Sequence, residues 1–298
     1  MEAPYSGNLR IWEGWTAPAL RGLPSSFHAS FLAGPHSPAA FAERLFAFEA
    51  LSPRTRASGK DDKAEPYSLQ WYLNIENQRH RRQGRWIPRL LEFSKHAGET
   101  LLGLGDGMGT DWLQYARHGA AVIVCTPSAE QLSLIRRNFE LRGLSGRFVH
   151  ASPRALPLEA ASIDVVCMSS LAPEGGEPGP VLDEVYRVLK PGGKVLAVAP
   201  ARYDVAFWSR LCFPLQHWLR SKAKRAEEEA ARYSRRGLRR LFAKFVEHRI
   251  HRRQLHRSQV PHLWRWAPMP ILERLMGRVL VLKAFKPVSA AISVQAAA

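Results

Sequence analysis

The 298-residue sequence has few cysteines, few acids relative to its bases, and no long uncharged apolar run. Its three cysteines, Cys125, Cys167 and Cys212, show no spacing typical of a zinc site, and the first two lie inside apolar runs. We therefore expect buried thiols in a reducing compartment. No uncharged apolar stretch approaches the roughly 18 residues that span a bilayer, and the first residues do not resemble a secretory signal. These absences favour a cytoplasmic protein that is attached, at most, to a membrane surface.

Acidic residues are scarce: 26 Asp and Glu stand against 43 Lys and Arg, which gives a net charge of +17. The excess is concentrated between Arg220 and Arg257, a segment with 14 basic residues and four glutamates. Such a segment attracts nucleic acid, anionic lipid or small anions. A solvated helix face in an arginine-rich protein explains the same composition, and the sequence leaves both interpretations open.

Apolar residues are abundant, at 46% of the chain, and they follow a regular order. After Glu99, short apolar runs of strand length alternate with helical patterns. The runs are residues 100–104, 121–125, 147–151, 163–169 and 193–200, and the helical patterns are 111–118, 129–141 and 181–189. A basic, tryptophan-containing helical section at 204–245 precedes two more candidate strands, 247–255 and 278–285. This alternation predicts an α/β fold: a doubly wound, mostly parallel sheet with helices on both faces.

The other segments predict the organisation around this core. Residues 1–66 are expected to form an N-terminal extension and linker, with one helix near 39–50, and residues 67–98 a helical lead-in. The core occupies residues 99–200. Residues 201–286 form a basic helical cover with the last two strands, and residues 287–298 a C-terminal tail.

A glycine-rich loop follows the first strand in the stretch LLGLGDGMGTD, residues 101–111. Its glycines permit a tight turn, keep side chains out of a ligand's way and expose backbone N–H groups at the start of the next helix. Ligands of doubly wound sheets bind at this carboxyl edge. A nicotinamide-dinucleotide site does not fit, because Thr110 replaces the third glycine and Thr126 replaces the acid that follows the second strand.

Three segments follow the loop in order: TPSAEQLSLIRRNF (126–139), HASPRALPLEAASIDVVCMS (150–169) and LDEVYRVLKPGGKVLAVAP (182–200). Together with the loop they resemble the class I S-adenosylmethionine-dependent methyltransferases, and among these the type 11 small-molecule branch that includes ubiquinone and menaquinone C-methylases. The resemblance covers residues 99–200. It implies a Rossmann-like, seven-stranded, mostly parallel sheet with an N-terminal helical extension and a helical insertion after the fifth strand.

The resemblance also implies S-adenosyl-L-methionine as the cofactor. The residues expected to bind it are Gly103, Gly105, Asp106, Gly107, Gly109, Thr126, Ser152, Pro153 and Ser169. Gly103, Thr126 and Ser152 stand where the family customarily has acids. A hydrogen bond to a charged group contributes about 1.5–3 kcal/mol and a neutral one about 0.5–1.5 kcal/mol, so Thr126 in place of a carboxylate weakens binding roughly 10- to 100-fold. Asp106, Asp111 and Glu130 are the nearby acids that can substitute.

Methyl transfer from a sulfonium is an in-line displacement that needs proximity, alignment and exclusion of water, but no metal. The sequence assigns no catalytic residue and no metal ligand. The aromatic and aliphatic residues of 202–220 are expected to wall the acceptor site. The function predicted is a methyltransferase acting on a small or lipid-like acceptor. Two alternatives stay open: a catalytically degenerate relative that binds RNA or anionic membrane through its basic face, and an RNA methyltransferase.

Overall fold

The computed structural model describes residues 64–65, 67–105, 107–169, 171, 177–212 and 232–288. The chain divides into two compact units, Met1–Asn74 and Ile75–Ala298. Of the first unit only the last residues are described, including the start of α4 (Leu69–Asn77). The helix expected at 39–50 and nearly all of the linker lie outside the described residues, and the predicted domain boundaries stay predictions. All seven strands belong to the second unit.

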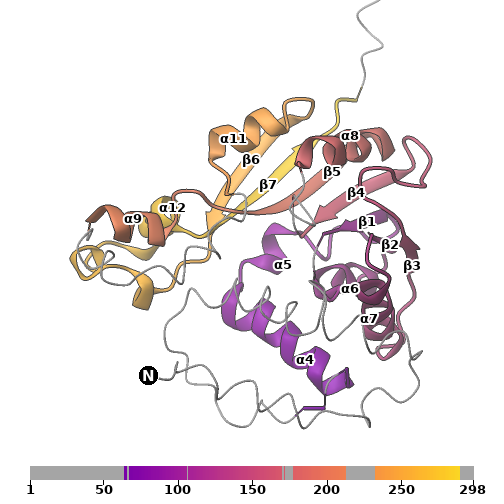
Figure 1. Cartoon of the computed structure of the whole chain (residues 1–298), viewed down its shortest axis with the longest axis horizontal. Coiled ribbons are helices and arrows are strands. Elements are labelled where there is room, and N and C mark those ends of the chain that lie inside the picture. Colours follow the sequence, from indigo (N-terminus) through magenta and orange to yellow (C-terminus); the bar gives the residue numbers. More distant parts are fainter. Residues whose placement is uncertain are drawn as a thin grey trace, which may run out of the picture. The chain divides into compact units, whose positions relative to one another are not determined.

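The seven strands form one sheet in the order β3-β2-β1-β4-β5-β7-β6 (Figure 1). Strands β1 to β5 run parallel to one another, whereas β7 pairs antiparallel with β5 and β6. Because the chain winds outward in both directions from β1 and β4, the carboxyl ends of these two strands mark the switch point at which ligands bind. The predicted doubly wound, mostly parallel sheet is confirmed. The strands are β1 (Thr100–Leu104), β2 (Ala121–Thr126), β3 (Arg147–His150), β4 (Ile163–Met168), β5 (Leu189–Pro200), β6 (Val246–Arg253) and β7 (Val279–Phe285).

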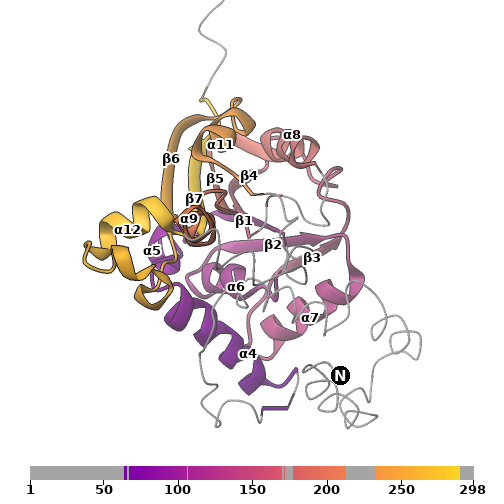
Figure 2. The same ribbon diagram turned by 60° about the vertical axis from the view of Figure 1, so that its left-hand side comes forward.

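Helices cover both faces of this sheet (Figures 1 and 2). One face packs against α8 and α11, and the opposite face packs against α5, α6 and α7. Alternate strand residues supply the two apolar clusters, since successive side chains of a strand point to opposite faces. The predicted N-terminal helical lead-in is confirmed as α4, a π-helix η1 and α5. The bounds are η1 (Gln78–Gln83), α5 (Ile87–Leu90), α6 (Thr110–Arg117), α7 (Ala129–Glu140), α8 (Pro178–Val188) and α11 (Arg235–Leu241).

Two cysteines lie inside these clusters. Cys125 and Cys167 are buried free thiols, as predicted. Burial raises the pKa of the Cys125 thiol to about 11 and that of the Cys167 thiol to about 12, so neither forms a nucleophilic thiolate near neutral pH. Within the described residues, no group of His, Cys, Asp and Glu side chains has the arrangement of a metal site.

A third, smaller apolar cluster lies after the end of β5. It joins α9, α12, the 3-10 turn η6 and residues on either side of the 3-10 turn η5, and Figures 1 and 2 both place α9 beside α12. The predicted helical section after the fifth strand is thus present as α9 and α11 in the part of the chain that the structure describes. The additional bounds are α9 (Val205–Cys212), η5 (Arg257–Gln259), η6 (His262–Trp264) and α12 (Met269–Met276).

A buried carboxylate, Glu92, joins three segments at the edge of the sheet opposite the glycine loop. It accepts hydrogen bonds from Lys95, Lys194 and Lys283 at 3.1, 2.7 and 2.8 Å. Burial alone raises the pKa of Glu92, but the three lysines outweigh it and lower this pKa to about 2. The cluster fixes the chain before β1 to the amino end of β5 and the carboxyl end of β7.

Candidate functional site

The glycine loop connects the end of β1 to α6, and its glycines differ in what surrounds them. A Cβ atom on Gly109 would lie 2.7 Å from the Ile135 side chain, so this glycine allows α6 and α7 to pack closely. Among the described residues, a Cβ on Gly107 would meet only the Ser169 hydroxyl, 4.0 Å away. The φ angle of Gly107 is +148°, which L-residues rarely adopt. The backbone at Gly107 therefore borders open space that a ligand can fill.

Gly103 is the position at which the resemblance stated above implies an acid. It is buried in β1 between Val124 of β2 and Cys167 of β4. A Cβ atom here would lie 2.6–2.8 Å from the indole of Trp112, whose Nε1 donates a hydrogen bond to the Cys167 carbonyl at 3.2 Å. The indole thus occupies the space of a side chain at this position, which gives a physical reason for the missing acid. The predicted contact between Gly103 and the cofactor stays a prediction.

The end of β2 is connected to the glycine loop by Gln131. The buried Thr126 hydroxyl donates to Gln131 Oε1 at 2.6 Å, and Gln131 Nε2 donates to the carbonyls of Gly107 and Gly105 at 3.0 and 3.4 Å. Ser128, the N-cap of α7, accepts the backbone N–H of Gln131 at 3.2 Å and so orients this turn. Thr126 and Gln131 form a neutral polar bridge beside the loop. Sequence analysis missed Gln131, although its place in the first turn after an N-cap serine was visible.

The other predicted residues lie along the same carboxyl edge. Ser169 follows β4, and its N–H donates to the Leu104 carbonyl at 2.9 Å, so it stands beside the start of the loop. Ser152 and Pro153 follow β3, two strands away; Ser152 is exposed and Pro153 is buried. Asp106 lies outside the described residues. The fold therefore brings Ser169, Thr126 and the glycine loop together, with Ser152 and Pro153 further along the edge.

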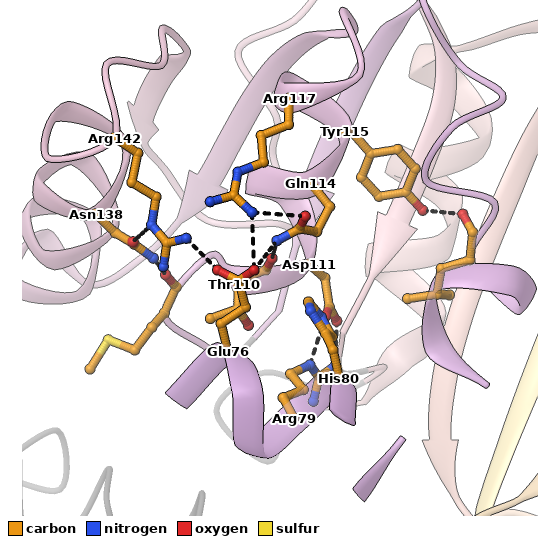
Figure 3. A network of polar contacts seen from close by, with 12 residues as sticks. Glu76, Arg79, His80, Thr110, Asp111, Gln114, Tyr115, Arg117, Asn138 and Arg142 are labelled. Carbon is orange, nitrogen blue, oxygen red and sulfur yellow. Dashed lines mark hydrogen bonds and ion pairs between the residues drawn. The ribbon is translucent and has the colours of Figure 1, made fainter. Parts of the chain in front are cut away.

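Asp111, in the first turn of α6, is buried in a network behind the loop (Figure 3). The Arg79 guanidinium donates hydrogen bonds to both carboxylate oxygens of Asp111, with Nε 2.7 Å from Oδ1. Nε2 of His80 lies 2.8 Å from the same Oδ1. Burial raises the pKa of Asp111, but these two partners outweigh it and hold the pKa well below the usual range. Asp111 is thus committed to the helical lead-in, so the structure does not favour the interpretation that it replaces a missing cofactor acid.

A second part of this network, also drawn in Figure 3, holds the rear of the loop. Asn138 of α7 donates to the Met108 carbonyl at 2.9 Å and accepts from Arg142 Nε at 3.0 Å. Arg142 also pairs with Glu76, which accepts from Arg117 at 3.0 Å. Helices α6 and α7 and the end of α4 are therefore linked to each other and to the loop. Because Gln131 and Asn138 bind loop carbonyls from α7, the loop is pre-organised without a ligand.

The aromatic and aliphatic residues after β5 are expected from the sequence to line the acceptor site. In the structure some of their side chains are packed in an apolar cluster and others are exposed. Trp208 of α9 packs on the third apolar cluster with Trp264, at a ring-centroid distance of 6.2 Å. Tyr203 and Phe207 contact each other edge to face and are exposed. The remaining candidates, Leu211, Phe213, Leu215 and Trp218, have side chains outside the described residues. A wall against an acceptor at this place stays a prediction.

A glycine loop at the carboxyl end of the first strand, beside the switch point, is typical of doubly wound proteins that bind nucleotide-like ligands. Comparison with known proteins narrows this class. Residues 101–197 match the family model described as a methyltransferase domain. The demethylmenaquinone methyltransferase of Clavibacter sepedonicus is 38% identical over 104 residues, and that of Thermus thermophilus is 31% identical over 117 residues. These alignments cover 34% and 38% of this chain but 40% and 53% of the relatives. The chain thus spans about half the length of these relatives, or less.

A solved structure shares the architecture. Geranyl diphosphate C-methyltransferase from Streptomyces coelicolor, in complex with Mg²⁺, geranyl-S-thiolodiphosphate and S-adenosyl-L-homocysteine, has a TM-score of 0.52 at 19% identity. The similarity covers 91% of this chain and 99% of that one. At this identity the likeness concerns the fold alone. Together with the domain match, it confirms the predicted resemblance to class I methyltransferases and the predicted fold.

Proposed function

We propose that this protein is an S-adenosylmethionine-dependent methyltransferase that transfers a methyl group directly to a small or lipid-like acceptor. The observation that carries the proposal is the open space beside Gly107, at the switch point of a domain that matches methyltransferases. Positive φ at Gly107 and the two α7 side chains that hold the loop maintain a cradle which a Cβ atom would fill. The space at Gly107 leaves the loop backbone accessible to a cofactor, and Thr126 and Gln131 offer neutral hydrogen-bonding groups in place of carboxylates.

Each predicted residue has a part in this proposal. Gly105, Gly107 and Gly109 present backbone beneath the methionine portion of the cofactor, and Thr126 with Gln131 offers neutral groups to the ribose. The remaining predicted contacts are with Gly103, Asp106, Ser152, Pro153 and Ser169. When bound, the cofactor supplies an electrophilic methyl group. The protein orients the acceptor and excludes water, which is the main contribution that an in-line displacement requires.

The acceptor class is proposed from the relatives. Two of them are named demethylmenaquinone methyltransferases, and the solved structure with the shared fold is a geranyl diphosphate C-methyltransferase. Quinones with prenyl tails and prenyl diphosphates are both lipid-like. They support an acceptor with an apolar portion, while the accepting atom stays open.

Isothermal titration with S-adenosylmethionine and S-adenosylhomocysteine tests the donor site. We expect both to bind the wild-type protein and neither to bind Gly107→Val, because the branched side chain occupies the ligand's space. Gly179→Val is the matched control, since a Cβ at Gly179 has nothing within 4 Å and its φ is ordinary. Circular dichroism checks that both variants are folded. Absence of binding to the wild type, or equal binding to folded Gly107→Val, would contradict the proposal and favour a degenerate relative.

We also propose that the protein is cytoplasmic and contacts anionic membrane peripherally. Within the described residues, no helix has the length and apolar character to cross a bilayer. Trp266, Ile271 and Leu275 are 83%, 52% and 44% exposed, and Arg257 and Arg274 are exposed in the same region. Exposed apolar side chains flanked by arginines are typical of a surface that inserts shallowly among anionic headgroups.

Co-sedimentation with vesicles tests this contact. We expect binding to phosphatidylglycerol vesicles, little binding to phosphatidylcholine vesicles, and weaker binding by Ile271→Glu. Leu141→Glu, just after α7, is an exposed apolar control away from α12. RNA binding whose affinity falls steeply with salt, without vesicle binding, would instead favour the RNA alternative.

A further inference from the structure

Two arginines are buried together where β5 ends. Arg252 of β6 and Arg278, just before β7, are 7% and 8% exposed. The strand register puts Arg252 opposite Leu280, and Leu280 opposite Ala199, while the Ala201 N–H donates to the Arg278 carbonyl at 2.8 Å. Residues opposite each other share a face, so both arginines lie on one face of the sheet, as diagonal neighbours. They stand at the same carboxyl edge as the glycine loop.

Within the residues that the structure describes, Asp204 is the acid that attracts both arginines, and its oxygens are already used. Asp204 Oδ2 accepts from Arg232 Nη1 at 3.1 Å, and Asp204 Oδ1 accepts from the Phe207 N–H at the start of α9 at 3.0 Å. The attraction of Asp204 for the two arginines is therefore shared with a third cation. One carboxylate among the described residues thus interacts with three guanidinium groups, which leaves an excess of positive charge.

The donors of the two arginines are incompletely bound. Arg252 Nη1 donates to the carbonyls of Tyr203 and Leu275, but its Nε is buried without a partner. Within the part of the chain that the structure describes, the Arg278 guanidinium makes no hydrogen bond and no ion pair. Burial lowers the pKa of both side chains, and neighbouring arginines lower it further. Tyr233, whose backbone bridges Ala201, also has a buried hydroxyl without a partner.

A buried charge without a counter-ion destabilises the folded protein, because it has lost its hydration and gained no compensating partner. Unsatisfied buried donors add to this cost. An oxyanion removes both costs, since it supplies negative charge and several acceptor oxygens. We propose that Arg278 and the Nε of Arg252 form a binding site for an oxyanion, phosphate or carboxylate, carried by the methyl acceptor. The assignment to the acceptor rests on the proposed methyltransferase function, whereas the anion site itself does not.

The sheet gives this site a place relative to the glycine loop. The order β1-β4-β5-β7-β6 separates the loop after β1 from Arg278, just before β7, by three strand spacings and from Arg252 of β6 by four, about 14 and 19 Å. Leu104, Met168 and Ala197 lie side by side, so Ala201 extends four residues, about 13 Å, beyond the level at which β1 ends. An acceptor that reaches both sites carries its anionic group on the order of 20 Å from the loop. This favours an extended acceptor over a compact one.

Thermal unfolding with added anion tests the site without the cofactor. Inorganic phosphate and acetate are compared with chloride at equal ionic strength, on the wild type, on Arg278→Met, and on Arg274→Met as an exposed control on α12. We expect phosphate or acetate to raise the melting temperature of the wild type and of Arg274→Met. In Arg278→Met we expect the melting temperature in chloride to be unchanged or higher, because an uncompensated charge is gone, and anion affinity to fall roughly 10- to 100-fold.

The two anions distinguish the chemistry of the group, since a larger response to phosphate indicates a phosphate ester and a larger response to acetate a carboxylate. Equal stabilisation of wild type and Arg278→Met, or no stabilisation of the wild type by either anion, would overturn the proposal. Titration of Arg278→Met with S-adenosylmethionine separates the two proposals, because the anion site predicts unchanged donor affinity. Failure of the wild type to bind the donor would remove the methyltransferase assignment and leave the anion result standing.

Discussion

Gly103→Ala should destabilise the protein although it adds a single methyl group. The new Cβ would lie 2.6–2.8 Å from three atoms of the Trp112 indole, against ordinary contacts of 3.4–4 Å. The indole cannot retreat easily, since it is buried and its Nε1 donates to the Cys167 carbonyl. Overpacking of this kind costs about 1–3 kcal/mol. Since 1 kcal/mol shifts the melting temperature of a domain of this size by about 2–4 °C, we expect a decrease of roughly 2–12 °C.

A double-mutant cycle tests the cause. Trp112→Leu alone should also destabilise, because it loses buried area and a hydrogen bond. Combined with Gly103→Ala, it removes the atoms that the methyl group meets, so the double variant should be more stable than the sum of the single effects by about 1–2 kcal/mol. Gly179→Ala, with open space around its Cβ, is the control and should change the stability little. Additive effects of the two substitutions in urea unfolding would refute steric exclusion as the reason for glycine at this position.

Three further substitutions test the network around the loop and the opposite edge of the sheet. Gln131→Leu should cost about 1–3 kcal/mol by leaving loop carbonyls without a donor, and should speed amide hydrogen exchange in the loop; unchanged exchange would contradict the bridge. Glu92→Gln should flatten the pH dependence of stability, measured by urea unfolding. With its pKa lowered from 4.5 to about 2, Glu92 contributes up to about 3 kcal/mol, present above pH 4.5 and lost as the pH falls toward 2; equal pH profiles would contradict this. Asp111→Asn should cost up to roughly 3–5 kcal/mol by leaving Arg79 without its carboxylate, and a loss below 1 kcal/mol in urea unfolding would show that the pair is dispensable.

Much of the fold was predictable because it depends on local patterns. Each core strand is a short apolar run, and the predicted bounds of the first four strands agree with the structure to within one residue. The fifth strand begins at Leu189, four residues before the predicted start at 193. Proline and glycine at 191–193 favour a turn in isolation. In the structure these residues belong to β5, and the pairing register between β4 and β5 shifts between Ile163 and Val165. A local sequence pattern does not reveal such a shift.

The site was predictable only in its backbone. The spacing of the glycines indicated the loop, but the side chains that hold the loop come from distant segments. Arg79 and Asp111 are 32 residues apart, and Gln131 reaches the Gly107 carbonyl across 24 residues. These contacts depend on how α7 and the helical lead-in pack against the loop. The spacing of residues along the sequence predicts contacts within one helix or strand, but it does not predict this tertiary packing. The indole over Gly103 likewise depends on the tertiary position of α6.

The bridge between Thr126 and Gln131 also bears on how the affinity for a ligand at this site would depend on pH and salt concentration. Neither side chain titrates in the physiological range, and neither carries a net charge that ions can screen. A carboxylate at the end of β2 would make ligand affinity fall in acid; the threonine hydroxyl and the glutamine amide do not impose that dependence. If the cofactor binds here as proposed, its affinity should be lower than with a carboxylate but should vary little as pH or salt concentration changes.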